Sequence, residues 1–230
     1  MKQDRMAVLA AMIDQGVIPV FHHADPEVCV GVIQACADAG AKCFEFTNRG
    51  DFAAGVFAEV ARHFAKADPS VILGAGSVVD APTAALYISH GARFIVGPLL
   101  NPEVARLCNR RKVAYSPGCA TPTEIGLAEE LGCEIVKLFP GAAAGGPDFV
   151  RAILGPMPWT RLMPTGGVDA SETSLRAWFG AGVAAVGVGS NLIAPDLLKS
   201  KDYKGLEARV RSTLKLVSTI RRELSGVGAS

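Results

Sequence analysis

Short apolar runs alternate along the chain with longer segments in which apolar side chains recur at helical spacing. Most of the short runs are continuously apolar, as in the strands of a parallel sheet that is covered on both faces. The runs predict eight strands, at residues 17–21, 42–46, 71–75, 93–97, 113–117, 134–139, 161–165 and 183–188. Strict alternation of strand and helix predicts a parallel α/β fold. Eight such units favour a (β/α)8 TIM barrel over an open doubly wound sheet.

The ends of the predicted helices carry recurrent signals. Three helices are expected to begin at a proline that follows a capping side chain, namely Asp25, Asn101 or Thr121. Glycines suited to the left-handed position just past a helix precede four strands, at Gly40, Gly91, Gly132 and Gly182. The signals at both ends of the helices therefore agree with the strand assignment.

No stretch has the composition of a linker, so residues 1–230 are predicted to form one barrel domain. Residues 1–15 are expected to form an N-terminal helix that caps the barrel bottom, and the barrel itself spans residues 17–193. The C-terminal extension, residues 194–230, has apolar residues at helical spacing between 203 and 224 and a basic opposite face. This pattern predicts an amphipathic helix with a packed stripe and a solvated face, rather than a membrane or partner surface.

Composition and charge exclude several classes of protein. Hydrophobic residues make up 50% and charged residues 20% of the chain, which excludes a disordered polypeptide. The 23 Lys and Arg against 22 Asp and Glu leave a formal charge of +1, so no nucleic-acid or membrane partner bound by bulk charge is expected. No apolar run has the length of a transmembrane helix, and Asp4 and Asp14 argue against a signal peptide.

The cysteines and histidines show no metal-binding spacing. The six cysteines include no C-x-x-C pair, which predicts reduced thiols in a cytoplasmic protein rather than disulfides. His22 and His23 are adjacent and would point to opposite sides of a strand, and the other two histidines stand alone. Structural roles are expected for all four, and neither a metal ion nor a cofactor is predicted.

A lysine inside a strand is the most informative polar residue. Lys137 lies in the sixth predicted strand between Val136 and Leu138. A strand lysine usually lies at the surface with its stem over apolar groups. A barrel strand, however, has helices on one side and the interior on the other, and lysine is rarely buried without a partner. Burial disfavours the charged ammonium, and a neutral amine can form a Schiff base with a ketone.

Glu45 repeats this argument with the opposite charge. In the second predicted strand, Phe44 and Phe46 point to one side and Glu45 to the other. A buried carboxylate needs a partner or must hold a proton. Across a shared barrel interior, Glu45 could pair with Lys137 and move protons during turnover, although a purely structural buried pair is the alternative. Arg49, in the following loop, could bind a carboxylate with its planar guanidinium.

Two glycine-rich turns predict an anion site. Residues 164–168 follow the seventh strand and residues 187–190 follow the eighth, where barrels commonly bind phosphate. Glycine lets backbone amides approach an anion, and a helix N-terminus favours negative charge. The run at residues 74–76 lacks the third glycine of a dinucleotide-binding motif, and we interpret it as a tight turn at the barrel mouth.

An ordered set of motifs carries a family resemblance. It comprises Ile18-Pro19-Val20, Phe44-Glu45-Phe46-Thr47-Asn48-Arg49, Gly74-Ala75-Gly76-Ser77, Ser116-Pro117-Gly118, Lys137-Leu138-Phe139-Pro140, Pro164-Thr165-Gly166-Gly167 and residues 187–190. In this order, the motifs resemble the 2-keto-3-deoxy-6-phosphogluconate (KDPG) and 4-hydroxy-2-oxoglutarate (KHG) aldolase family over residues 17–193.

The resemblance implies a class I, metal-independent pyruvate aldolase. Lys137 would form the Schiff base and Glu45 would be the general acid/base. The residues implied to bind the rest of the substrate are Arg49, Ser77, Pro98 and Thr165, with Gly166, Gly167, Gly189 and Ser190 around the phosphate. The products would be pyruvate and either glyceraldehyde 3-phosphate or glyoxylate. The family also implies a homotrimer.

Departures from the family pattern leave the aldehyde partner open. Gly97-Pro98 stands where Ser-Pro is common, and Gly141-Ala142 where the family often has Ala-Glu.

Two other functions remain as alternatives. A sugar-phosphate isomerase or epimerase would use Glu45 as its base and leave Lys137 unexplained. A non-catalytic sugar-phosphate-binding barrel would bind without turnover.

Overall fold

Parallel strands form the centre of the computed structural model, which describes residues 4–226. The strands are β1 Val17–Phe21, β2 Cys43–Thr47, β3 Ile72–Gly76, β4 Phe94–Val96, β5 Ala114–Ser116, β6 Gly118–Cys119, β7 Val136–Leu138, β8 Leu162–Pro164 and β9 Val186–Val188. They form two parallel sheets, in the orders β5-β4-β3-β2-β1-β9 and β6-β7-β8. The expected parallel α/β fold is therefore confirmed.

The strands curl, but their hydrogen bonding does not close into one ring. The predicted strand at 113–117 is split into β5 and β6 at Pro117, which has no amide hydrogen to donate. At the other junction, β8 and β9 are joined by an isolated bridge between Thr165 and Gly187. The expectation of eight continuous strands in a closed barrel is thus corrected to two sheets that curl around a common interior.

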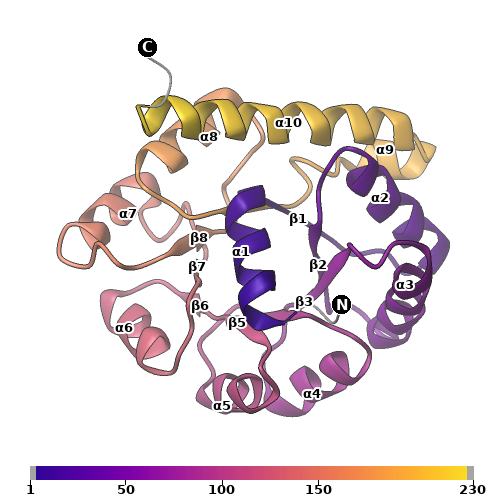
Figure 1. Cartoon of the computed structure of the whole chain (residues 1–230), viewed down its shortest axis with the longest axis horizontal. Helices are drawn as coiled ribbons and strands as arrows, with labels where there is room; N and C mark the ends of the chain where they lie inside the picture. The colour runs from indigo at the N-terminus through magenta and orange to yellow at the C-terminus, as the bar shows by residue number, and fades with distance from the viewer. Residues whose placement is uncertain (1–3, 227–230) are drawn as a thin grey trace.

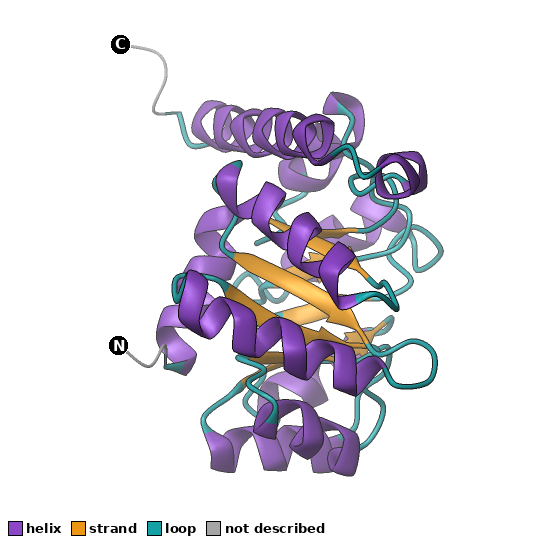
Figure 2. Cartoon of the chain, turned by 90° about the vertical axis from the view of Figure 1, so that its right-hand side faces the viewer, coloured by secondary structure: helices purple, strands orange, loops and turns teal. Residues whose placement is uncertain are grey.

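Helices surround the curled sheets, as Figures 1 and 2 show from two directions. They are α1 Arg5–Gln15, α2 Pro26–Asp38, α3 Ala53–Ala67, α4 Ala81–Ser89, α5 Pro102–Arg111, α6 Pro122–Glu130, α7 Gly146–Leu154, α8 Glu172–Gly180, α9 Pro195–Ser200 and α10 Tyr203–Leu224. Asp25, Asn101 and Thr121 cap α2, α5 and α6 as predicted, each just before a proline. The glycines expected past four helix ends all have positive φ, at 105° (Gly40), 106° (Gly91), 80° (Gly132) and 99° (Gly182).

The interior between the sheets is filled by alternate residues of the strand segments and closed by α1. One buried apolar cluster fills this interior. It contains side chains from α1 and from each strand other than β6, or from the residue just before the strand: Val8, Leu9, Met12, Ile18, Cys43, Ile72, Phe94, Val96, Ala114, Ile135, Met163 and Ala185. Figure 1 shows α1 across the centre of the ring of helices. The other strand face packs on the surrounding helices, as with Phe44 and Phe46 of β2.

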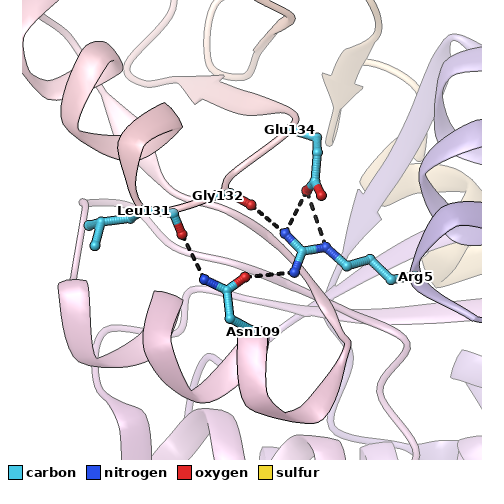
Figure 3. Close-up of polar contacts among 5 residues, drawn as sticks. All are labelled: Arg5, Asn109, Leu131, Gly132 and Glu134. Carbon is cyan, nitrogen blue, oxygen red and sulfur yellow. Dashed lines mark hydrogen bonds and ion pairs between the residues drawn. The ribbon is translucent and has the colours of Figure 1, made fainter.

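Polar contacts attach α1 to the start of β7 (Figure 3). The Arg5 guanidinium donates to the Glu134 carboxylate at 2.8 Å and to Asn109 Oδ1 at 2.6 Å, and it also bonds the Gly132 carbonyl. Asn109 in turn donates to the Leu131 carbonyl at 2.8 Å. One partly buried arginine therefore ties the N-terminal helix to the segment that leads into the lysine-bearing strand.

Helix α10 packs on α2 and α8 along one side of the ring. Leu206, Val210 and Val217 are buried as the amphipathic pattern predicts. The packed stripe continues through Ile220, whereas Leu224 is exposed. Between residues 4 and 226, no helix is long and apolar enough to cross a membrane.

Candidate active site

Two charged side chains meet in the interior at the end opposite α1. Lys137 extends from β7 and Glu45 from β2, and both are buried, with 5% and 1% exposure. The Lys137 Nζ lies 3.7 Å from Glu45 Oε1 and 4.9 Å from the centre of the Phe139 ring. Alternation along β2 predicted this side for Glu45, because Cys43, two residues earlier, also faces the interior cluster.

Glycines of β3 make room for this pair. A Cβ at Gly76 would collide with Glu45 Oε1, and a Cβ at Gly74 would collide with the Phe94 ring. Both glycines lie inside β3, paired with β2. The interpretation of residues 74–76 as a tight turn is therefore wrong: the run is a strand whose missing side chains leave interior space for Glu45 and Phe94.

Two buried polar atoms next to this space lack partners within the described residues. They are Glu45 Oε2 and Thr165 Oγ1. Thr165 follows β8, and its hydroxyl lies over Gly187, where a Cβ would collide with it. A buried polar atom without a hydrogen bond costs roughly 1–3 kcal/mol, so both atoms are suited to bind a polar ligand.

A cavity of about 550 Å³ opens at this end of the interior. Six of the predicted site residues line it: Arg49, Thr165, Gly166, Gly167, Gly189 and Ser190. Phe139 also lines the cavity, and the Lys137 amine lies over its ring. The structure therefore brings the predicted carboxylate-binding and phosphate-binding residues to one cavity, with the Lys137–Glu45 pair adjoining it through Phe139.

Ser77 and Pro98 lie on neighbouring loops after β3 and β4, and neither is among the residues that line this cavity in the described chain. Ser77 has a positive φ of 58°. The next amide, that of Val78, donates to the Val96 carbonyl at 3.1 Å and ties the loop after β3 to the end of β4. Pro98 lies close to Gly118, because a Cβ at Gly118 would collide with the Pro98 carbonyl oxygen.

The glycine turns after β8 and β9 have the geometry of an anion site. Gly166 and Gly167 have φ of 87° and 77°, a region that favours glycine. The loop after β7 fixes this turn, because the Gly141 amide donates to the Thr165 carbonyl at 2.8 Å. Within residues 4–226, the amides of Gly167 and Ser190 donate to no other backbone carbonyl, so they are available to an anion.

Sequence reasoning missed His22, for which it expected only a structural role. His22 lines the cavity, stacks on Phe46 at 5.8 Å between ring centres, and donates from Nε2 to the Arg49 carbonyl. Burial, followed by the charges of Arg49 and His23, lowers the pKa of His22 below its usual value. The position directly after the first strand was the available signal, because barrel sites are built from such positions.

Comparisons with known proteins show the family to which this chain belongs. The family model for KDPG and KHG aldolase matches residues 8–209. The 2-dehydro-3-deoxy-phosphogluconate aldolase of Treponema pallidum is 32% identical over 204 residues, covering 89% of this chain and 94% of that protein. The KHG/KDPG aldolase of Escherichia coli is 30% identical over 200 residues, covering 86% and 91%.

A solved structure shows the same architecture. The KDPG aldolase of Legionella pneumophila, crystallised with pyruvate captured as a covalent carbinolamine intermediate, aligns with a TM-score of 0.82. It is 27% identical in sequence, and the alignment covers 93% of this chain and 99% of that one. The protein is thus an aldehyde-lyase by class. It belongs to the KDPG and KHG aldolase family.

Proposed function

We propose that this protein is a class I Schiff-base aldolase that reversibly cleaves a 2-keto-3-deoxy sugar acid phosphate to pyruvate and glyceraldehyde 3-phosphate. The preferred substrate is 2-keto-3-deoxy-6-phosphogluconate, and 4-hydroxy-2-oxoglutarate, which yields pyruvate and glyoxylate, is a second one. The observation that carries the proposal is the buried Lys137 amine, 3.7 Å from Glu45, beside a cavity lined by Arg49 and glycine turns.

The reaction starts when Glu45 takes a proton from the Lys137 ammonium, and the neutral amine then attacks the C2 ketone of the substrate. Glu45 donates a proton to the resulting carbinolamine hydroxyl, which leaves as water and gives the protonated imine. Glu45, now a carboxylate, takes the proton of the C4 hydroxyl. The C3–C4 bond breaks, its electrons move into the imine to form an enamine, and the aldehyde departs. Protonation at C3 and hydrolysis then release pyruvate and restore the amine.

The second carboxylate oxygen of Glu45 suits this role. Glu45 Oε2 is buried and has no hydrogen-bond partner in the described part of the chain. One oxygen can therefore face the Lys137 amine while the other exchanges protons with substrate. The Legionella pneumophila relative, with its covalent pyruvate carbinolamine, supports the same chemistry here.

Substrate binding divides between two ends of the site. Arg49 pairs with the substrate carboxylate, and Ser77, Pro98 and Thr165 surround the pyruvyl group. The phosphate binds to the turns that contain Gly166, Gly167, Gly189 and Ser190. A cavity of about 550 Å³ is within the usual range for small-molecule sites and has room for a six-carbon phosphorylated acid.

Further proposals concern the whole molecule. The interior cluster, which draws on both sheets and α1, supports a barrel that is closed by side-chain packing, capped by α1 and flanked by α10. We infer one domain, with residues 1–15, 17–193 and 194–230 as its three parts. A homotrimer in the cytoplasm, working without metal or cofactor, completes the proposal.

A substrate panel tests the proposed function. Pyruvate release is measured with 2-keto-3-deoxy-6-phosphogluconate, its galactonate epimer and 4-hydroxy-2-oxoglutarate, for wild type and Lys137→Ala. We expect the largest kcat/KM for a phosphorylated acid and none above background for Lys137→Ala. A folded wild-type protein that releases pyruvate from none of the three contradicts the proposal and leaves the isomerase and binding-protein alternatives.

A further inference from the structure

The C-terminal helix reaches the mouth of the site through one side chain. Arg209 of α10 donates from Nη2 to the main-chain carbonyl of Asn191 at 2.7 Å. The Asn191 side chain donates from Nδ2 to the Val168 carbonyl at 3.3 Å. These two bonds link α10 to the loop after β9, and that loop to the loop after β8.

Both linked loops form part of the proposed phosphate site. Val168 and Asn191 line the cavity together with the glycine turns that precede them. Arg209 and Asn191 also share a second hollow on the outer side of the same loop. The link therefore runs from the helical exterior to the cavity wall.

Glycine-rich turns need such support to bind an anion well. Glycine loses more backbone freedom on ordering than any other residue, so a turn that is free to move must be ordered by its ligand. In the β9 turn, the amides of Leu192 and Ile193 both donate to the Gly189 carbonyl, which fixes the turn internally. Those bonds do not join this turn to Gly166–Gly167. The two turns are joined before the glycines by the Thr165–Gly187 bridge and beyond them by the Asn191–Val168 bond, so the latter fixes their outer ends.

We propose that Arg209 and Asn191 are positioning residues that hold the two glycine turns at the separation a phosphate group requires. The inference rests on the proposed function for the identity of the anion. Arg209 acts without touching the ligand, by fixing the backbone of Asn191. It gives α10 a role in substrate affinity in addition to its packing on α2 and α8.

The same helix supplies a matched control. Arg211 is also exposed and also donates to a main-chain carbonyl, that of Asp38 at the end of α2, at 2.5 Å. It pairs with Glu207 within α10 as well. Arg211→Ala thus removes an equivalent bond between α10 and the rest of the fold, at a place away from the cavity.

The experiment measures two properties of each variant: the dissociation constant of inorganic phosphate by titration calorimetry, and the rate of pyruvate attachment under borohydride. For Arg209→Ala and Asn191→Ala, we expect phosphate to bind about five- to tenfold more weakly, the effect of losing one hydrogen bond. Pyruvate attachment should stay at the wild-type rate in Arg209→Ala, because Arg209 does not line the cavity. Arg211→Ala should leave both values unchanged, and Arg209→Lys, which keeps a donor, should bind phosphate better than Arg209→Ala.

Several results would overturn the inference. They are phosphate affinity unchanged in both alanine variants, an equal loss in Arg211→Ala, or no phosphate binding to wild type. Asn191→Leu, which keeps the approximate size without the donor and adds no charge, replaces Asn191→Ala if that variant does not fold. Failure of the aldolase proposal has a different signature, because wild type would then bind phosphate without attaching pyruvate.

Discussion

The two ends of the curled sheets contrast in how their polar groups are satisfied. At the α1 end, apolar side chains fill the interior, and Arg5 bonds Glu134, Asn109 and the Gly132 carbonyl. At the opposite end, Lys137 and Glu45 are buried together, and Glu45 Oε2 and Thr165 Oγ1 lack hydrogen-bond partners within the described residues. The third such atom, Thr160 Oγ1, lies before the start of β8 and is not among the groups that line the cavity. One end contributes stability, and the other keeps polar groups unsatisfied for a ligand, which is the expected division in a barrel enzyme.

Replacing one glutamate at each end of the sheets should give the largest difference in kcat between the two ends. Glu45→Gln removes the group proposed to move protons, so kcat should fall by about 10²–10⁴-fold. Glu134→Gln makes the same chemical change at the α1 end, where it only weakens the contact with Arg5. Steady-state kinetics of pyruvate release check this prediction. A Glu45→Gln enzyme with wild-type kcat, or an equal loss in Glu134→Gln, would contradict the division.

A core substitution at the α1 end should affect stability and leave chemistry intact. Met12 is fully buried in the interior cluster, and Met12→Ala should lower the free energy of unfolding by about 2–5 kcal/mol. Denaturant unfolding measures the loss, and kcat at a temperature where the variant is folded should match wild type. A large fall in kcat with little change in stability would show that α1 takes part in the site.

One added methyl group at the end that carries Lys137 and Glu45 should lower activity and leave stability intact. Gly76→Ala places a Cβ where Glu45 Oε1 lies, so the carboxylate must shift from its position 3.7 Å from the Lys137 amine. A displacement of this size should lower kcat by roughly 10²-fold. Gly55→Ala, in α3, is the control, because a Cβ there meets nothing within 4 Å. Equal activity of the two variants would show that the position of Glu45 is unimportant.

The smallest predicted effect is on the pH dependence of stability, through the titration of His22. Its pKa in the folded protein lies below the ordinary histidine value of about 6.5, so below that pH the unfolded chain binds more protons than the folded one. Wild type should therefore lose stability as pH falls through 6.5 and below, and His22→Gln should lose less. Thermal unfolding from pH 7.5 to 5.5 tests this, and identical pH profiles for the two proteins would refute it.

Strand parity explains why the Lys137–Glu45 pairing could be predicted from the sequence. Alternate residues of a strand share a face, and in this fold one face is the interior, so opposite charges that face the interior at the same level can pair. The functions of Gly76, His22 and Asn191 could not be found in this way. Each depends on a neighbour from a distant segment: Gly76 on Glu45, His22 on the Arg49 carbonyl, and Asn191 on Val168.

Local sequence also failed at the junctions between strands. Pro117 lies within an apolar run that predicts one strand, but its missing amide hydrogen divides the run into β5 and β6. The glycine run at 74–76 has the composition of a turn, yet β2 and β4 hold it in the sheet. The first outcome follows from the chemistry of one residue, whereas in the second tertiary pairing overrides composition.

Borohydride trapping with pyruvate tests the central claim most directly. The folded protein is incubated with pyruvate and borohydride, and the product is read by intact-mass and peptide mass spectrometry. We predict one stable pyruvate-derived adduct, located on Lys137 and absent from Lys137→Ala. No adduct on the folded protein, or an adduct that persists in Lys137→Ala, would contradict the account of Lys137 as the Schiff-base residue.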